Sequence, residues 1–166
     1  MRCALSLLLP VILVAMPPPD RSPEQRQFDF WVGEWEVQDA KGLLLGHNRV
    51  VSLLGGSVLQ EHWEGSQGGA GTSLNAYQPD RRSWRQCWID AKGGTLDLEG
   101  GLEGASMVLK GVKEGPKGRL SERITWTPLP DGRVRQLWEQ SKDGSTWTVA
   151  FDGYYCRTGA QPSSRP

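Results

Sequence analysis

The chain reads Trp84-Arg85-Gln86-Cys87-Trp88-Ile89-Asp90 in the segment whose pattern decides the fold. Side chains along an extended strand point alternately to its two faces, so Trp84, Gln86, Trp88 and Asp90 share one face. The next residues, Lys92-Gly93-Gly94, are typical of a tight turn, and another strand-like run begins directly after them. The segment therefore predicts two antiparallel strands joined by a short turn, with one face that is both aromatic and polar.

Similar strand-like runs, separated by turn signals, continue on both sides of this segment. The connections carry Gly, Pro and Asp, and none is long enough for the crossover helix that parallel pairing needs. An open meander of this length exposes two edges, and closure removes them. We therefore expect an all-β fold, an antiparallel up-and-down barrel of about ten strands. The expected strands are Gly33–Asp39, His47–Leu54, Ser57–Glu64, Thr72–Gln78, Trp84–Ala91, Leu96–Gly101, Ser106–Val112, Leu120–Thr127, Arg133–Ser141 and Thr146–Cys156.

Length and composition agree with a single β domain. The 166 residues include 21 Gly and 8 Trp, which argues against an all-helical bundle. The 19 basic residues are matched by 19 acidic ones, and no basic cluster marks one face, so binding to nucleic acid is not expected.

The N-terminus has the pattern of an export signal. Arg2 precedes an apolar stretch of about 13 residues, which is too short to span a bilayer as a helix, so an integral membrane protein is not expected. We expect a signal peptide at residues 1–16, a loose leader at 17–27, the barrel at 28–157 and a disordered tail at 158–166. The protein is then periplasmic or secreted. The alternative is a buried N-terminal strand in a cytoplasmic protein.

The aromatic and polar face recurs on other expected strands. Val, Ile and Leu are typical of a plain core, whereas amides beside Trp or Tyr suit a lumen in which stacking and hydrogen-bonding groups meet a ligand. The alternative is a solvent-facing side of the sheet. For residues 58–64 both faces stay open as the inward one, because Leu59, Glu61 and Trp63 form the face opposite to Gln60 and His62. The expected ligand-binding residues are Gln60, His62, Asn75, Tyr77, Gln86, Trp88, Asp90, Gln136, Trp138 and Gln140.

Motifs for catalysis or metal binding do not occur. The sequence has no nucleophile elbow, phosphate-binding loop, HExxH or paired CxxC, so no catalytic residue, metal or cofactor is assigned. Asp90 is either an acid or base beside Trp88 or, as we favour, a strand-end residue of the following turn.

Cys87 and Cys156 fall on strands that an ordered barrel places on opposite walls, so both are expected to be free thiols.

Several motifs resemble a known family. The Gly33-x-Trp35 motif resembles the start of the first strand of lipocalins, and four further runs strengthen the likeness: Gly71-Thr72-Ser73-Leu74-Asn75, Trp84-Arg85-Gln86-x-Trp88, Thr125-Trp126-Thr127-Pro128 and Arg135-Gln136-Leu137-Trp138-Glu139-Gln140-Ser141. Residues 28–157 thus look like a bacterial family of exported lipocalin-like domains of unknown function. The resemblance implies a calycin-type barrel in which Arg157 covers Trp35. Nitrobindins also open with Gly-x-Trp, but their haem-binding His has no counterpart after His62.

The leading functional hypothesis is an exported protein that binds a small amphipathic or hydrophobic molecule in its lumen. One alternative is an enzyme of the cyclase or isomerase kind, with Asp90 or His62 as acid or base. Another is an envelope interaction module whose exposed Trp residues contact a protein or glycan. The direction of the Trp and Gln face distinguishes them, because binding and catalysis require that it point inward.

Overall fold

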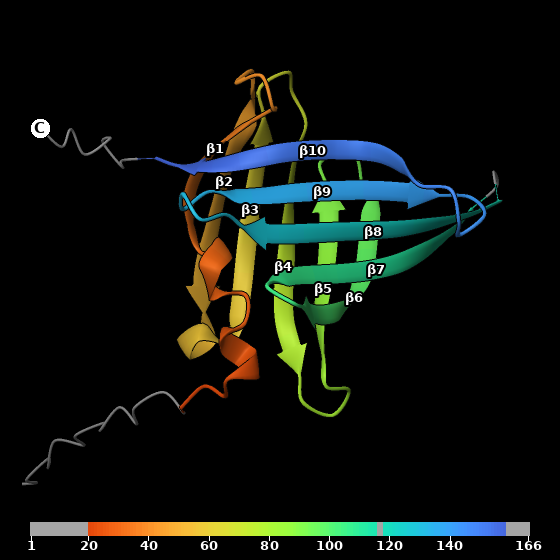
Figure 1. Cartoon of the computed structure of the whole chain (residues 1–166). Helices are drawn as coiled ribbons and strands as arrows, with labels where there is room; N and C mark the ends of the chain where they lie inside the picture. Colours follow the sequence, from red (N-terminus) through yellow and green to blue (C-terminus); the bar gives the residue numbers. More distant parts are fainter. Residues whose placement is uncertain (1–19, 116–117, 159–166) are drawn as a thin grey trace, which may run out of the picture.

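The chain forms a closed barrel of ten antiparallel strands, shown in Figure 1. The computed structural model describes residues 20–115 and 118–158. Each strand pairs with its neighbours in sequence, and β1 (Gly33–Gln38) pairs with β10 (Thr148–Arg157) to close the ring. The expected all-β, up-and-down barrel is confirmed. The expected signal peptide, residues 17–19 of the expected leader and residues 159–166 of the expected tail at 158–166 lie outside the described residues.

Every expected strand is present, and the bounds differ by a few residues at the ends. The turns are as short as expected, so each strand returns beside its predecessor. The remaining strands are β2 (Leu44–Leu53), β3 (Val58–Gly65), β4 (Ala70–Gln78), β5 (Ser83–Asp90), β6 (Thr95–Glu103), β7 (Ser106–Gly115), β8 (Gly118–Pro128) and β9 (Val134–Ser141).

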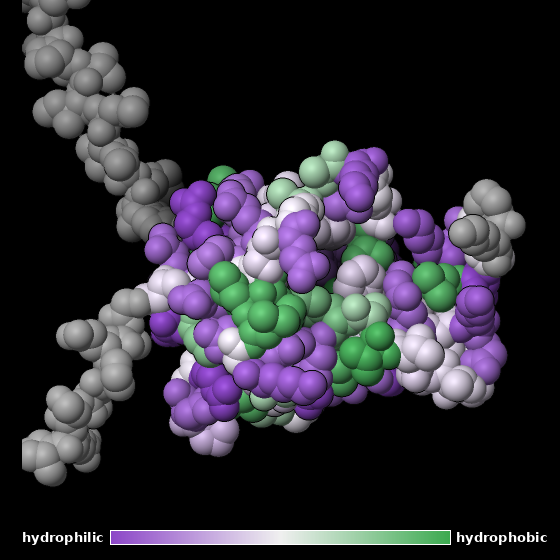
Figure 2. Space-filling view, turned by 90° about the horizontal axis from the view of Figure 1, so that it is seen from above, coloured by the Kyte–Doolittle hydropathy of each residue, from purple (hydrophilic) through white to green (hydrophobic). Residues whose placement is uncertain are grey.

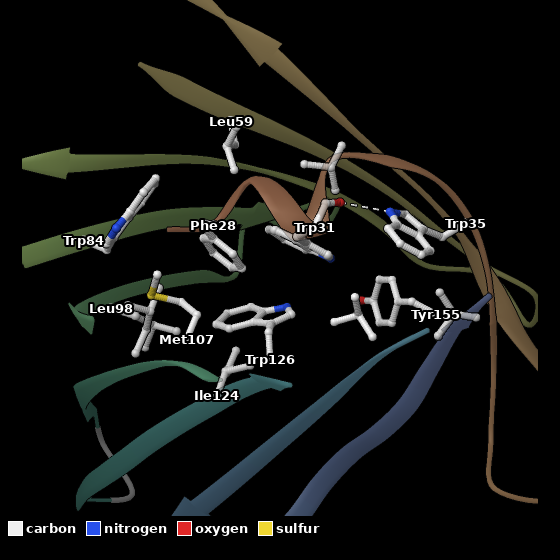
Figure 3. Close-up of a cluster of buried hydrophobic side chains, with 14 residues drawn as sticks. Phe28, Trp31, Trp35, Leu59, Trp84, Leu98, Met107, Ile124, Trp126 and Tyr155 are labelled. Carbon is white, nitrogen blue, oxygen red and sulfur yellow. Dashed lines mark hydrogen bonds between the residues drawn. The ribbon is translucent and has the colours of Figure 1, made fainter. Parts of the chain in front are cut away.

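A short N-terminal segment enters the barrel at one end and closes it. Its two 3₁₀ helices, η1 (Glu24–Arg26) and η2 (Asp29–Trp31), precede β1, and a third, η3 (Leu54–Gly56), joins β2 to β3. Phe28 and Trp31 are fully buried and their rings stack with centroids 4.9 Å apart. Figure 3 shows both rings among the side chains of the surrounding strands. These aromatic side chains fill the closed end, where a barrel of this size otherwise leaves space.

Residues 21–27, part of the expected loose leader at 17–27, contact the barrel. The indole Nε1 of Trp84 on β5 donates to the Glu24 carbonyl and to Gln27 Oε1, each at 3.2 Å. Arg21 pairs with Asp29 at the start of η2. The first contact connects the segment before β1 to β5, and the second connects the start of this segment to η2.

The outer wall is charged. Cross-strand ion pairs on it include Arg85–Asp97 between β5 and β6, and Arg135–Asp152 between β9 and β10. The face seen in Figure 2 carries separate apolar patches among hydrophilic side chains. Within residues 20–115 and 118–158, no helix is long and apolar enough to cross a membrane.

Candidate functional site: a cavity inside the barrel

The inward faces of six strands surround a cavity of about 110 Å³. It lies between the two ends of the barrel. At the closed end is the aromatic plug formed by Phe28 and Trp31, and at the opposite, open end the turn at residues 91–94 joins β5 to β6. Most of its wall is apolar and aromatic, with one carboxyl, two amides and one phenol. The lining residues are Glu61, Trp63, Gln86, Trp88, Leu96, Ile124, Trp126, Gln136, Trp138, Phe151 and Tyr155.

The aromatic walls depend on local backbone features. Gly71 of β4 lies against the Trp88 indole, and a Cβ at this position would overlap the ring. On β10, an irregularity between Val149 and Phe151 brings Phe151 opposite Trp138. A bulge of this kind re-aims the side chains that follow it. The Phe151 ring then meets Trp63 edge-on with centroids 5.8 Å apart.

Glu61 is the charged residue of this cavity. It is 5% exposed, and its carboxylate accepts hydrogen bonds from Asn48 Nδ2 and from Ser73 Oγ, both at 2.7 Å. Burial raises the pKa of Glu61 to about 7, although the hydrogen bonds from Ser73 and Asn48 oppose the rise. The side chain therefore changes its charge near neutral pH.

Amide and hydroxyl groups extend from Glu61 along the wall. Gln86 Nε2 donates to Asn75 Oδ1 at 2.8 Å, and Asn75 Nδ2 donates to Ser73 Oγ at 2.9 Å. On the other side, the Tyr155 hydroxyl donates to Gln136 Oε1. A connected network satisfies buried polar groups and fixes their orientation.

A second hollow of about 160 Å³ adjoins the cavity towards the open end and shares Trp88, Leu96 and Trp138 with it. Glu122 of β8 borders this hollow and is 3% exposed. Its carboxylate accepts hydrogen bonds from Trp138 Nε1 at 2.6 Å and from Gln140 Nε2 at 3.2 Å. The two hollows thus share two Trp side chains, and each has a buried carboxyl group.

The structure brings most of the expected site residues to the inside of the barrel. Gln86, Trp88, Gln136 and Trp138 border the cavity. Asp90 and Gln140 border the second hollow. Asn75 does not border either hollow but accepts a hydrogen bond from Gln86, which lines the cavity. Tyr77 packs at the closed end, with its ring centroid 6.2 Å from that of Trp84.

The inward orientation expected for Gln60 and His62 is wrong. Their neighbours Leu59 and Glu61 are buried, so strand alternation turns Gln60 and His62 to the outer face of β3. His62 borders a hollow on the outer side of β1–β3, together with His47 and with the charged residues Glu34, Arg49 and Glu64. Neither side chain lines the cavity.

Asp90 has the structural role that the sequence favoured. Its Oδ1 accepts hydrogen bonds from the backbone N–H groups of Lys92 at 2.8 Å and Gly94 at 2.9 Å. These bonds, that from Gly94 first, hold the pKa of Asp90 below its usual value. Asp90 therefore stabilises the turn between β5 and β6 as an ionised carboxylate.

Sequence reasoning missed both buried acids and several aromatic walls. Glu61 and Glu122 alternate in phase with core residues, Leu59 on β3 and Ile124 on β8. That phase is the signal that marks them as inward. The other missed residues are Trp63, Leu96, Ile124, Trp126, Phe151 and Tyr155.

Cys87 and Cys156 are free thiols in the part of the chain that the structure describes, as expected. β5 and β10 lie on opposite sides of the ring order. In the same residues, no group of three His, Cys, Asp or Glu side chains is close enough together to hold a metal ion.

Comparison of the chain with protein-family models and with curated proteins finds no match. The fold and the site define the class, a closed ten-stranded β-barrel with a lined interior cavity.

Proposed function

We propose that the protein binds a small molecule in the lumen of its barrel, as an exported lipocalin-like binding protein. The observation that carries the proposal is the composition of the cavity wall, where indole rings and amides face the same interior space. Sites of this kind combine apolar surface for affinity with a few fixed polar groups for orientation. Export is supported by the sequence pattern of residues 1–16.

Native mass spectrometry of the protein purified from its own host tests this proposal. A co-purifying small molecule is expected, released when the barrel is denatured. Trp88→Ala should lower its occupancy, whereas Trp147→Ala should not, because Trp147 packs against Arg123 outside the cavity. Equal occupancy in both variants, or no bound molecule in any preparation, contradicts lumen binding.

An isomerase-like enzyme is the second candidate, favoured by one specific observation. Glu61 and Tyr155 border the same cavity, and a carboxyl group whose pKa is about 7 suits general acid or base catalysis. Asp90 and His62, the acid or base candidates from the sequence, are replaced by this pair. Under this alternative, Glu61→Gln retains the bound molecule but stops its conversion, which mass analysis of the released compound detects.

An interaction module has less support. That alternative requires Trp88 and Trp138 on the outer wall, and both border the interior cavity.

A further inference from the structure

We infer that the interior cavity and its adjoining hollow select a small organic cation, an alkylated ammonium compound that also carries an oxygen acceptor. This inference rests on the proposed lumen binding and names the chemical class of the ligand.

The charges around the two hollows favour a cation. Glu61 is the charged residue of the inner cavity. Asp90, Glu122 and Lys113 are those of the outer hollow. The backbone hydrogen bonds from Gly94 and Lys92 lower the pKa of Asp90, and the positive charge of Lys113 acts in the same direction. Of the described residues that border the two hollows, Lys113 is therefore the single base, and Asp90 offsets it. Glu61 and Glu122 face the interior with neutral hydrogen-bond donors but no basic partner.

The aromatic walls favour an alkylated ammonium over a metal ion. Trp63, Trp88, Trp138 and Phe151 surround the same space. Ring faces attract ammonium groups within about 6 Å of the centroid, and this attraction is stronger where water is excluded. A hydrated metal ion needs several oxygen ligands, whereas methyl or methylene groups on nitrogen are well matched to indole surface.

Trp126 supplies an independent indication of a ligand. It borders the cavity and is 1% exposed, yet its indole Nε1 has no hydrogen-bond acceptor among the residues that the structure describes. A buried donor without an acceptor destabilises the folded protein. A hydroxyl or carbonyl oxygen on the ligand satisfies this N–H, so an amino alcohol fits better than a plain alkylammonium ion.

The dimensions restrict the ligand to a few heavy atoms. The inner cavity of about 110 Å³ is smaller than the cavity of roughly 150 Å³ that admits benzene in another protein. The outer hollow of about 160 Å³ continues from it past Trp88 and Trp138. Choline has seven heavy atoms and is larger than benzene, so it needs the inner cavity together with the outer hollow, whereas a long-chain lipid exceeds both.

Glu61 links cation binding to pH. The groups that face it are Asn48 from β2, Ser73 from β4 and Tyr155 from β10. Burial raises the pKa of Tyr155 well above 10, so Glu61 is the group of this set that titrates near neutrality. A cation favours the ionised carboxylate, so affinity should rise roughly tenfold from pH 6 to pH 8.

The test compares three compounds of one shape: choline, its neutral carbon analogue 3,3-dimethylbutan-1-ol, and the anion 3,3-dimethylbutanoate. Binding to the folded protein is measured by calorimetry and by saturation-transfer NMR. Choline is expected to bind at least about tenfold more tightly than the alcohol, and the anion is expected not to bind. Equal affinities for choline and the alcohol overturn the cation inference but leave lumen binding intact. Failure of choline to bind also overturns it, and native mass spectrometry still judges the proposed function separately.

Two charge-removing variants locate the interaction. Glu61→Gln and Glu122→Gln should each weaken choline binding about tenfold without changing the affinity for the alcohol. Glu61→Gln should also abolish the pH dependence. The matched control is Glu139→Gln, next to Trp138 in sequence but paired with Arg123 on the outer wall, and it should leave choline binding unchanged. Circular dichroism and the thermal midpoint establish that each variant is folded. Unchanged choline affinity in both folded lumen variants contradicts the inference.

Discussion

The guanidinium of Arg157 lies over the indole ring of Trp35, 4.3 Å from the ring centroid. The two residues are register partners in the β1–β10 pair that closes the barrel. Arg157 Nη1 also donates to the Val32 carbonyl at 3.2 Å. Gly33 leaves room for this arrangement, because a Cβ there would overlap the guanidinium and its φ of +149° is unfavourable for other residues. The contact between Arg157 and Trp35 that the sequence resemblance implied is confirmed.

Trp35→Ala is expected to lower the free energy of unfolding by about 3–5 kcal/mol, the range for a large buried aromatic. Trp35 is 1% exposed, and its Nε1 donates to the Trp31 carbonyl at 3.0 Å, as Figure 3 shows. The change removes packing, this hydrogen bond and the surface under Arg157. Urea unfolding followed by circular dichroism measures the loss.

Trp147→Ala is the matched control for Trp35→Ala. Its ring lies 4.2 Å from the Arg123 guanidinium, but the residue is only half-buried. We expect a loss of about 1 kcal/mol or less. A folded Trp35→Ala protein with the unfolding midpoint of the wild type contradicts the structural role of Trp35.

The barrel was predictable because its information is local. Alternation in segments such as 84–90, with short Gly-containing turns, determines strand length and antiparallel pairing, and ten such strands close on themselves. Which face of a strand points into the barrel depends less on the local sequence. On β3, Leu59, Glu61 and Trp63 alternate with Gln60 and His62, and both sets mix polar and apolar side chains. The inward set is decided by cross-strand neighbours, Val50 on β2 and Ser73 on β4.

The burial of the two acids of the site depends on neighbouring strands in the same way. A carboxylate is stable inside the barrel only where hydrogen bonds compensate for lost water. Those for Glu61 come from Asn48 and Ser73, and those for Glu122 come from Trp138 and Gln140. All four donors lie on neighbouring strands, so the phase shared with Leu59 and Ile124 points the two acids inward but does not reveal the donors that make their burial possible. The aromatic plug around Phe28 likewise requires contacts between elements distant in sequence.

Glu61 should make the stability of the barrel depend on pH. The unfolded chain loses this proton near pH 4.5, whereas the folded chain retains it up to about pH 7. Between these values only the folded state holds the proton, so stability falls as pH rises and becomes level above pH 7. The loss is about 3 kcal/mol. Urea unfolding at several pH values from 4 to 8 measures it.

Glu61→Gln isolates this contribution, because the amide stays neutral and can still bond Asn48 and Ser73. Relative to the wild type, the variant should gain stability as pH rises from 4.5 to 7. The control variant Glu139→Gln, paired with Arg123 on the outer wall, should follow the wild-type profile in this range. Parallel profiles for the wild type and Glu61→Gln mean that Glu61 has an ordinary pKa in the folded protein.

The two cysteines of the barrel should react differently. A chain that starts after residue 16 is expected to take up two alkyl labels when it is denatured without reductant, because both thiols are free. In the folded state, Cys87 should be labelled before Cys156, since Cys87 is exposed and Cys156 is half-buried. Intact-mass analysis over time follows both steps. A chain that takes up no label when denatured contains a disulfide, which the ring order of β5 and β10 does not permit.

Trp88→Ala and Trp138→Ala should each weaken a small molecule bound in the lumen by about 1–3 kcal/mol, the contribution of a stacking aromatic. Both indoles border the inner cavity and the outer hollow, so each change removes wall from both.

Trp88→Ala should reduce stability less than Trp35→Ala, because Trp88 is only half-buried. Trp138→Ala should cost more than Trp88→Ala, because it also removes the 2.6 Å hydrogen bond from Nε1 to the buried Glu122 carboxylate. Trp138→Phe separates the two roles, since it keeps an aromatic wall but deletes the N–H donor. Titration of the ligand identified by native mass spectrometry, paired with urea unfolding of each variant, measures both quantities. Wild-type ligand affinity in folded Trp88→Ala and Trp138→Ala proteins would place the binding site outside this cavity.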